Sequence, residues 1–424
     1  MTYWASANIC ALSTARPVGR SVDPEPMIRM LIIGYCMGIR SERRLCEEVY
    51  VNLAYRWYCR LGLEGDVPRQ STFSKNRHGR FRHSDVLRQM FETTVARCIA
   101  EGLVGGEGFA VDDSLVRADV NRQNAVDKAD GLPDPATSRS VREYLAVKDD
   151  AAFGGATPVP RKQLAVADPA ARWTAASRER AFFAYATNYL IDLQNAVIVD
   201  FEATTAIRQA EITAQRRMID RTQERFGLWP ERLVGDAGYG DAKNLYWLVE
   251  EPGIEPHIPV VDHSVGRNDT FERSAFSYGH EDDSHICPAG KRLRQRQKVY
   301  REDRPFVDEN GMLRYRSSKL DCDACALKPR CCPTQPARTI LRSVHEGARD
   351  FARDIATTDA YLVSRRHRNK CREAVRAPQA HPQNGSPAPA RSKRRKRRVP
   401  PRSNCPNLRK MAKLIPMPAT PAHA

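Results

Sequence analysis

The chain has 424 residues, of which 41% are hydrophobic and 28% are charged, a balance typical of folded proteins with two or three domains. Its longest apolar stretch, residues 30–39, is interrupted by glycines and is too short to cross a bilayer. Residues 1–20 lack the order of a signal peptide, so the sequence argues against a membrane protein and predicts a cytoplasmic location. Twelve cysteines in such a chain predict thiols or metal ligands rather than a secreted disulfide framework.

A formal net charge of +17 predicts a polyanionic partner. Residues 391–402 hold eight basic side chains and no acidic one, so subtracting these eight charges from 17 still leaves +9 on the rest of the chain. Nucleic acid is favoured over an anionic membrane surface, because no amphipathic basic helix is evident.

Residues 23–102 are predicted to form a helical domain. Asp23, Ser41 and Ser84 are residue types that cap helices, and apolar residues recur at helical spacing after each of them. No structure is assigned to residues 1–22.

Residues 103–260 are predicted to form a mixed α/β core. A short strand, GFAVDDSL, is followed by a hairpin of AFFAYATNYLID and NAVIVDFEA, and then by helix, strand, helix and strand. Residues 121–180, between the first strand and the hairpin, are polar and predict a long loop or short helices.

Four segments follow the core. Residues 261–345 are charged and irregular and contain four spaced cysteines, which predicts an insertion. Residues 346–370 return to a helical pattern. Residues 371–406 have the composition of a disordered basic and proline-rich segment, and residues 407–424 form a C-terminal tail.

Asp112 and Asp236 are candidate metal ligands. Each follows a short predicted strand, at the edge of an α/β sheet where ligands bind. If the two strands are neighbours, the carboxylates provide the hard oxygen ligands of divalent cations, and such a pair suits two-metal chemistry on phosphodiesters. The alternative is that each aspartate only caps the turn that follows it.

Six stretches of the chain carry a family resemblance, in this order: IRMLIIGYCMGIRSERRLCEEVYVNLAYRWYCRLGL, STFSKNRHGRF, VDDSLVRADVNRQ, FFAYATNYLIDLQNAVIVDFEAT, LVGDAGYG and NLRKMAKLIPMP. They are similar to bacterial insertion-sequence transposases of the DDE type. The resemblance implies an α/β fold, a ribonuclease H-like mixed sheet with helices, preceded by an all-α N-terminal domain and interrupted by the Cys-containing insertion. It also implies DNA transposition and DNA recombination.

In that family three acids bind two Mg²⁺ ions, and the resemblance puts the first two acids on Asp112 and Asp236. The choice of Asp112 over Asp113 rests on the resemblance alone. The implied partners are double-stranded DNA, as transposon terminal repeats and target DNA, and a second copy of the chain in a homodimer. Residues 23–102 are implied to contact the transposon ends.

The third acid is missing where the resemblance implies it. That acid lies four residues after an arginine of the last core helix, and four residues after Arg368 stands Arg372. Glu373 is the substitute catalytic candidate. One residue on a helix rotates a side chain by about 100°, so Glu373 requires a shifted helix register. Strand cleavage and strand transfer are therefore expected to be weak or absent.

A frameshift is one hypothesis for this loss. Residues 371–383, CREAVRAPQAHPQ, can be back-translated so that the frame one base later encodes Ala-Glu-Lys-Leu-Phe-Ala-His-Leu-Lys-Arg-Ile-Leu, an amphipathic helix with an acid at position 372. A second, compensating shift before NLRKMAKLIPMP would restore the frame. The alternative is a selected DNA-binding tail, whose phosphate contacts would make binding salt-dependent.

Four cysteines form a candidate structural Zn²⁺ site: Cys287, Cys322, Cys325 and Cys331. They lie in ICPAGKRL and CDACALKPRC, and their spacing is that of a tetrahedral thiolate site. Cys332 competes with Cys331 for the fourth position. Reduced cysteines without metal are the alternative.

Two functions of other classes remain as alternatives. One is a DNA-binding protein without catalysis that occupies transposon ends. The other is a zinc-stabilised scaffold whose acids are only structural.

Overall fold

The computed structural model describes residues 23–39, 41–78, 85–120, 123, 125–127, 134, 136, 138–146, 163–175, 180–260, 270–295, 307–309 and 311–376. The chain divides into two compact units, Met1–Pro230 with Arg366–Ala424, and Glu231–Arg365. Within the described ranges, no helix has both the length and the apolar composition that a membrane span needs.

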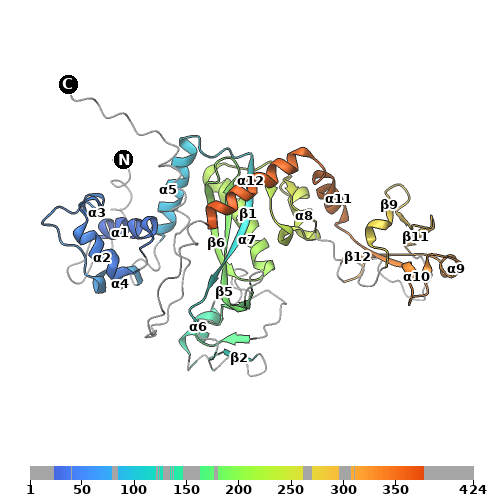
Figure 1. The fold of residues 1–424 in the computed structure, drawn as a ribbon, viewed down its shortest axis with the longest axis horizontal. Helices are drawn as coiled ribbons and strands as arrows, with labels where there is room; N and C mark the ends of the chain where they lie inside the picture. Colours follow the sequence, from blue (N-terminus) through green and yellow to red (C-terminus); the bar gives the residue numbers. More distant parts are fainter. Residues whose placement is uncertain are drawn as a thin grey trace. The chain divides into compact units, whose positions relative to one another are not determined.

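The first unit begins with four short helices that pack on one another (Figure 1): α1 (Pro24–Met37), α2 (Glu42–Val51), α3 (Leu53–Tyr58) and α4 (Gln70–His78). Asp23 caps α1 as predicted, because its side chain accepts the N–H of Glu25 at 3.0 Å. A buried apolar cluster holds the four helices together, made of Met27, Met30, Leu31, Ile33, Leu45, Cys46, Val49, Cys59 and Phe73.

The predicted helix that follows Ser41 is broken into two at Asn52. Ser41 caps α2 as predicted. The Asn52 side chain accepts the N–H groups of Ala54 at 3.0 Å and Tyr55 at 3.3 Å, and so begins a new helix. Asparagine competes for backbone N–H groups in this way, which a count of apolar periodicity does not register.

A six-stranded sheet carries the predicted acidic ligands. Its strand order is β4-β5-β1-β7-β8, and β6 pairs with β5. The strands are β1 (Gly108–Arg117), β4 (Arg172–Thr174), β5 (Phe182–Asp192), β6 (Ile198–Thr205), β7 (Arg232–Val234) and β8 (Glu255–His257). The segment before β4 contributes β2 (Ala125–Asp127), α6 (Arg139–Ala146) and β3 (Gln163–Ala165). The predicted order of strand, hairpin, helix, strand, helix and strand is confirmed, and with it the mixed α/β class.

The turn of the predicted hairpin is organised by Asp192, which ends β5 and is 1% exposed. Its Oδ2 accepts the N–H groups of Gln194 and Asn195, both at 3.0 Å, and its Oδ1 accepts that of Gly105 at 3.0 Å. Burial raises the pKa of Asp192, and these N–H groups act in the opposite direction. The bonds tie the segment before β1 to the end of β5, which fixes the two strands in register.

Helices α5 (Val86–Ala100) and α7 (Arg208–Phe226) both contact β6. Ser84, the predicted cap of α5, lies outside the described residues. Asp200 of β6 is 1% exposed and forms ion pairs with Arg88 of α5 and, at 2.9 Å, with Arg221 of α7. Two opposite charges compensate the buried carboxylate, so the two helices are held on the same strand.

In the second unit, β7 and β8 run parallel, with α8 (Ala242–Glu250) between them in the chain. Asp241 begins α8, because its side chain accepts the N–H groups of Lys243 and Asn244, both at 3.1 Å. Helix α11 (Glu346–Ile355) packs against α8.

Residues 261–345, predicted as a Cys-containing insertion, contain a five-stranded antiparallel sheet in the order β13-β12-β11-β10-β9. Its strands are β9 (Ser277–Gly279), β10 (Ser284–Ile286), β11 (Arg292–Gln295), β12 (Met312–Arg316) and β13 (Thr339–Ser343), and two short helices, α9 (Lys319–Asp323) and α10 (Lys328–Cys331), follow β12. Strands of three to five residues are too short for alternation to be visible in the sequence. The sequence therefore predicted an insertion here but not its sheet.

The helix predicted over residues 346–370 is two helices, α11 and α12 (Asp359–Arg376). Helix α12 continues six residues beyond that range, so the segment predicted to be disordered, 371–406, begins inside a helix. Cys371 is 1% exposed and its thiol donates to the carbonyl of Asp192 at 3.7 Å, so burial against β5 favours helix where the sequence shows no apolar period. Residues from 377 onward lie outside the described part of the chain.

Candidate functional site

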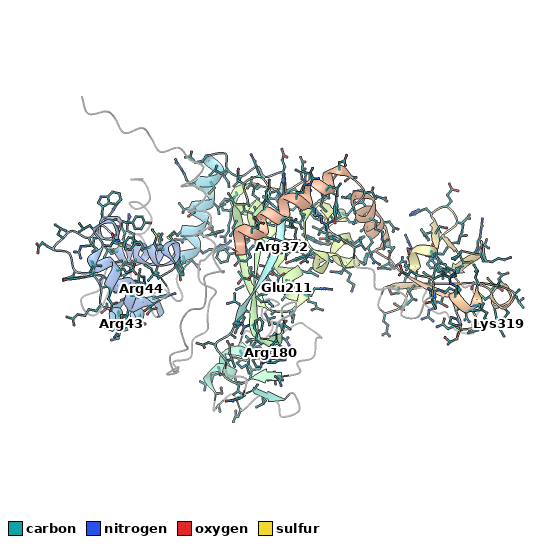
Figure 2. The ribbon with its side chains drawn as sticks, in the orientation of Figure 1. Arg43, Arg44, Arg180, Glu211, Lys319 and Arg372 are labelled. Atoms are coloured by element: carbon teal, nitrogen blue, oxygen red, sulfur yellow. The ribbon has the colours of Figure 1, made fainter. Side chains whose placement is uncertain are left out.

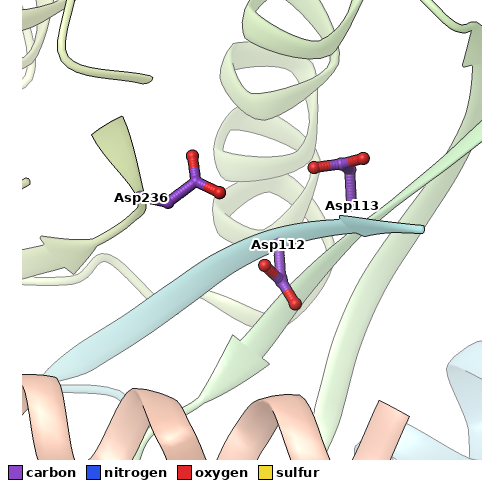
Figure 3. Close-up of side chains that lie close together, drawn as sticks. All are labelled: Asp112, Asp113 and Asp236. Atoms are coloured by element: carbon purple, nitrogen blue, oxygen red, sulfur yellow. The ribbon is translucent and has the colours of Figure 1, made fainter. Parts of the chain in front are cut away.

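β1 presents two adjacent aspartates on opposite faces (Figure 3). Asp112 lies opposite Tyr189 of β5, and Asp113 lies opposite Asn188. Successive side chains of a strand alternate between its faces, as the sequence predicts for this pair. Asp112 is 6% exposed, whereas Asp113 is half-buried.

Asp112 does not end its strand, contrary to the prediction. β1 continues five residues beyond it, to Arg117, and stays paired with β5 throughout. The apolar run ends at Val111, but ladder pairing with a long neighbouring strand extends the strand past it. Asp112 therefore caps no turn, and its side chain projects from a backbone held in the sheet.

Asp236 follows β7 and begins a single turn of 3₁₀ helix, Ala237–Tyr239. Its Oδ1 accepts the N–H of Gly238 at 2.8 Å, so it caps this turn, as the alternative interpretation expected. The backbone here is close to its surroundings: a Cβ on Gly238 would lie 2.7 Å from Asp236 Oδ1, and one on Gly240 would lie 2.1 Å from the carbonyl oxygen of Pro259. The two glycines thus let the turn hold the aspartate in place.

Asp112, Asp113 and Asp236 each offer one carboxylate oxygen, and these oxygens lie within 4.8 Å of one another (Figure 3). In the described part of the chain, no other group of three His, Cys, Asp or Glu side chains brings its ligand atoms this close. Carboxylate oxygens are the ligands of hard divalent cations. The sequence prediction named Asp112 and Asp236 but passed over Asp113, although the adjacent acid was the available signal.

Two arginines of α12 contact Asp112. Arg368 Nη2 donates to Asp112 Oδ1 at 2.9 Å, and Arg372 Nε lies 3.6 Å from Asp112 Oδ2. Residues four apart on a helix share a face, so both guanidinium groups reach the same carboxylate. Arg368 is 8% exposed, and Arg372 lies on the part of α12 that faces the strands (Figure 2).

Arg372 therefore stands beside Asp112, where the family resemblance implied an acid. Glu373, the substitute candidate, is exposed one position further along α12. It is not a member of the three-carboxylate group. The structure does not bring Glu373 together with Asp112 and Asp236, because the 100° step of the helix turns it away from the face that carries both arginines.

The predicted thiolate ligands gather at one pocket of the second unit. Its lining includes Cys287, Cys322, Cys325, Cys331 and Cys332. Ser317 Oγ lies 2.8 Å from Cys322 Sγ, and Cys287 Sγ accepts the N–H of Lys291 at 3.3 Å. Burial raises the pKa of the Cys331 thiol to about 11, and the neighbouring Cys332, Cys322 and Cys287 act in the same direction. The five cysteines are free thiols in the structure.

Two family models match the chain. Residues 7–79 match the family described as Transposase domain (DUF772), and residues 107–321 match the family described as Transposase DDE domain. The second match covers half of the chain and contains Asp112, Asp113 and Asp236, whereas α12 lies outside it. No curated protein and no solved structure matches the chain.

Replacing Asp112 by alanine is expected to destabilise the protein, because Arg368 would keep a buried guanidinium without this carboxylate. Removing one partner of a buried ion pair costs about 3 to 5 kcal/mol, so the free energy of unfolding from urea titration should fall by about 3 kcal/mol. The matched control is Asp113→Ala, on the same strand and half-buried, with an expected loss of about 1 kcal/mol. Equal stabilities of Asp112→Ala and the unchanged protein would contradict the ion pair.

Proposed function

The chain belongs to the transposase DDE domain family, and we propose that it acts in DNA transposition and recombination on double-stranded DNA. Its substrates would be the terminal repeats of an insertion sequence and the target DNA that receives the element. The α/β sheet with its preceding helices agrees with the ribonuclease H-like class of that family. The proposed location is the cytoplasm, and a homodimer would offer one such site to each end of the element.

The observation that supports this proposal most directly is the group of Asp112, Asp113 and Asp236 inside the matched domain. The three carboxylates are a donor set that fits Mg²⁺, which takes oxygen ligands and keeps several waters. We propose Asp112 and Asp236 as its ligands and Asp113 as a further one. Bound Mg²⁺ would activate a water or a DNA 3′-hydroxyl and stabilise the oxygen that leaves phosphorus.

The chain's own residues would hold the DNA. Arg365 and Lys370 are exposed on α12, the helix that crosses Asp112. Arg43 and Arg44 are exposed on α2 in the helical region (Figure 2). Guanidinium and ammonium groups bind phosphate oxygens and set the register of a protein on the duplex. These two basic elements support contact with the scissile strand and with the terminal repeat, respectively.

The proposed reaction has two displacements at phosphorus. In the first, a water oxygen bonds to phosphorus at the element's end and the bond to the 3′ oxygen breaks, which leaves a free 3′-hydroxyl. In the second, that hydroxyl attacks a phosphodiester of the target DNA and displaces its 3′ oxygen. The carboxylates of Asp112 and Asp236 would fix the site at which both displacements occur.

A second candidate function, end binding without cleavage, is favoured by the two arginines at Asp112. Both oxygens of that carboxylate have a guanidinium within 3.6 Å. An aspartate engaged in this way is a poor ligand for a cation. The chain would then occupy transposon ends and compete there with an intact enzyme.

We predict that the full-length chain retards DNA that carries the element's terminal repeats but cuts it weakly or not at all in Mg²⁺. Gel retardation and cleavage of end-labelled DNA measure the two properties on the same sample. Asp236→Ala is the matched variant, and its retardation should equal that of the unchanged chain with and without Mg²⁺. Efficient Mg²⁺-dependent cleavage that Asp112→Ala abolishes would contradict end binding without catalysis. Absence of repeat-specific retardation would contradict the proposed DNA partner.

We also propose that the thiol pocket binds one structural Zn²⁺ through Cys287, Cys322, Cys325 and Cys331. Five sulfur donors around one pocket fit Zn²⁺, and four thiolates leave no open position for substrate. Cys331 is preferred over Cys332, because it packs both against the cluster that Cys287 contacts and against the cluster that contains Cys322. Among the described residues the thiols do not form a group within 4.8 Å, so they would close around the metal.

Elemental analysis of the chain purified without chelator should find about one zinc per chain. Cys331→Ser should lose the metal and lower the melting temperature, because folding and binding are coupled at such sites. Cys332→Ser is the matched control and should keep the zinc. Retention of zinc by Cys331→Ser and its loss in Cys332→Ser would reverse the choice of ligand. A metal-free unchanged chain would contradict the site.

A further inference from the structure

Two positive charges from α12 lie beside Asp112 in the first unit. Asp112 and Asp113 on β1 contribute two negative charges, and Arg368 and Arg372 on α12 contribute two positive charges. The arginines contact Asp112 at 2.9 and 3.6 Å. A carboxylate whose charge is already compensated attracts a divalent cation less than an uncompensated one does, and guanidinium groups at this distance repel the cation.

The arginines are held in place by packing. Arg368 is 8% exposed, and Cys371, on the next turn, is 1% exposed with its thiol on the carbonyl of Asp192. Asp192 is itself fixed by the N–H groups of Gly105 and Gln194. Helix α12 therefore has an anchor that does not depend on the ion pair.

The two contacts are unequal. Arg368 makes a direct hydrogen bond and is buried, whereas the side chain of Arg372 is 34% exposed and its Nε is 3.6 Å from the carboxylate. Removal of Arg372 would thus open one side of Asp112 to solvent and leave Arg368 as its partner. A change of charge at Arg372 would therefore alter the surroundings of Asp112 with less effect on buried packing than a change at Arg368.

We propose that Arg368 and Arg372 serve as built-in cations that weaken divalent metal binding at Asp112, and that Arg372 is the residue that controls this affinity. The inference rests on the proposed metal role of the carboxylate group. A carboxylate at position 372 would instead bring a second acid beside Asp112. A neutral residue there would have an intermediate effect.

The test is a titration of the full-length chain with Mn²⁺ without DNA, followed by electron paramagnetic resonance of the free ion. Arg372→Glu should bind Mn²⁺ at least about tenfold more tightly than the unchanged chain, which corresponds to about 1.4 kcal/mol. Arg372→Gln, which has the size of the glutamate variant without its charge, should fall between them. The added Arg372→Glu affinity should disappear in the double variant Asp112→Asn/Arg372→Glu.

Arg366→Glu is the matched control, because it makes the same change of charge at an exposed position of α12 that is turned away from Arg368 and Arg372. Its Mn²⁺ affinity should equal that of the unchanged chain. Far-ultraviolet circular dichroism verifies that each variant is folded. If Arg372→Glu does not fold, the Mn²⁺ affinity of Arg372→Gln is compared with that of the unchanged chain instead. Equal Mn²⁺ affinities of the unchanged chain and both Arg372 variants would overturn the proposal, as would a gain that survives Asp112→Asn.

The outcome is independent of the proposed action on DNA. A gain of Mn²⁺ affinity that depends on Asp112 supports the proposed role of the two arginines, even if no variant retards or cuts terminal repeats. Tight Mn²⁺ binding at Asp112 in the unchanged chain would overturn the proposed role of Arg368 and Arg372, while the proposed transposase function would stand.

Discussion

The ion pair between Asp112 and Arg368 joins positions 256 residues apart within the first unit. Its carboxylate comes from β1, which β5 holds in register from Phe109 to Arg117. Its guanidinium comes from α12, which Cys371 fixes at the end of β5. The contact is buried on both sides, so neither charge has water as an alternative partner. The position of α12 and the chemistry of Asp112 are therefore set together.

This coupling explains why two functions are proposed for the same carboxylates: metal-dependent transposition, and binding of transposon ends without cleavage. Asp112, Asp113 and Asp236 are the kind of oxygen cluster that holds divalent cations. Arg368 and Arg372 supply positive charge to the most buried of the three. With arginines there, the charge of Asp112 is compensated, which opposes binding of a divalent cation. With a carboxylate at position 372, the site would favour metal.

Local sequence patterns were sufficient to predict much of this fold. The β5–β6 hairpin, α7 and the strand pair β7 and β8 were predictable because alternation, helical spacing and glycine turns act within a few residues. The break at Asn52 was not predicted, because the Asn52 side chain takes the place of a backbone carbonyl as acceptor of the Ala54 N–H. The sheet of β9 to β13 was not predicted, because its strands are too short to show alternation. The length of β1 was not predicted, because pairing with β5 determines it. The contact between Asp112 and Arg372 follows from tertiary packing, so the sequence indicated only that an expected acid was absent.

Anomalous diffraction from crystals of the unchanged chain grown with Mn²⁺ tests the central claim most directly. We expect that Arg368 and Arg372 remain on Asp112 and that no anomalous peak lies within coordination distance of its oxygens. A peak at Asp112, with the arginines displaced from the carboxylate, would contradict it.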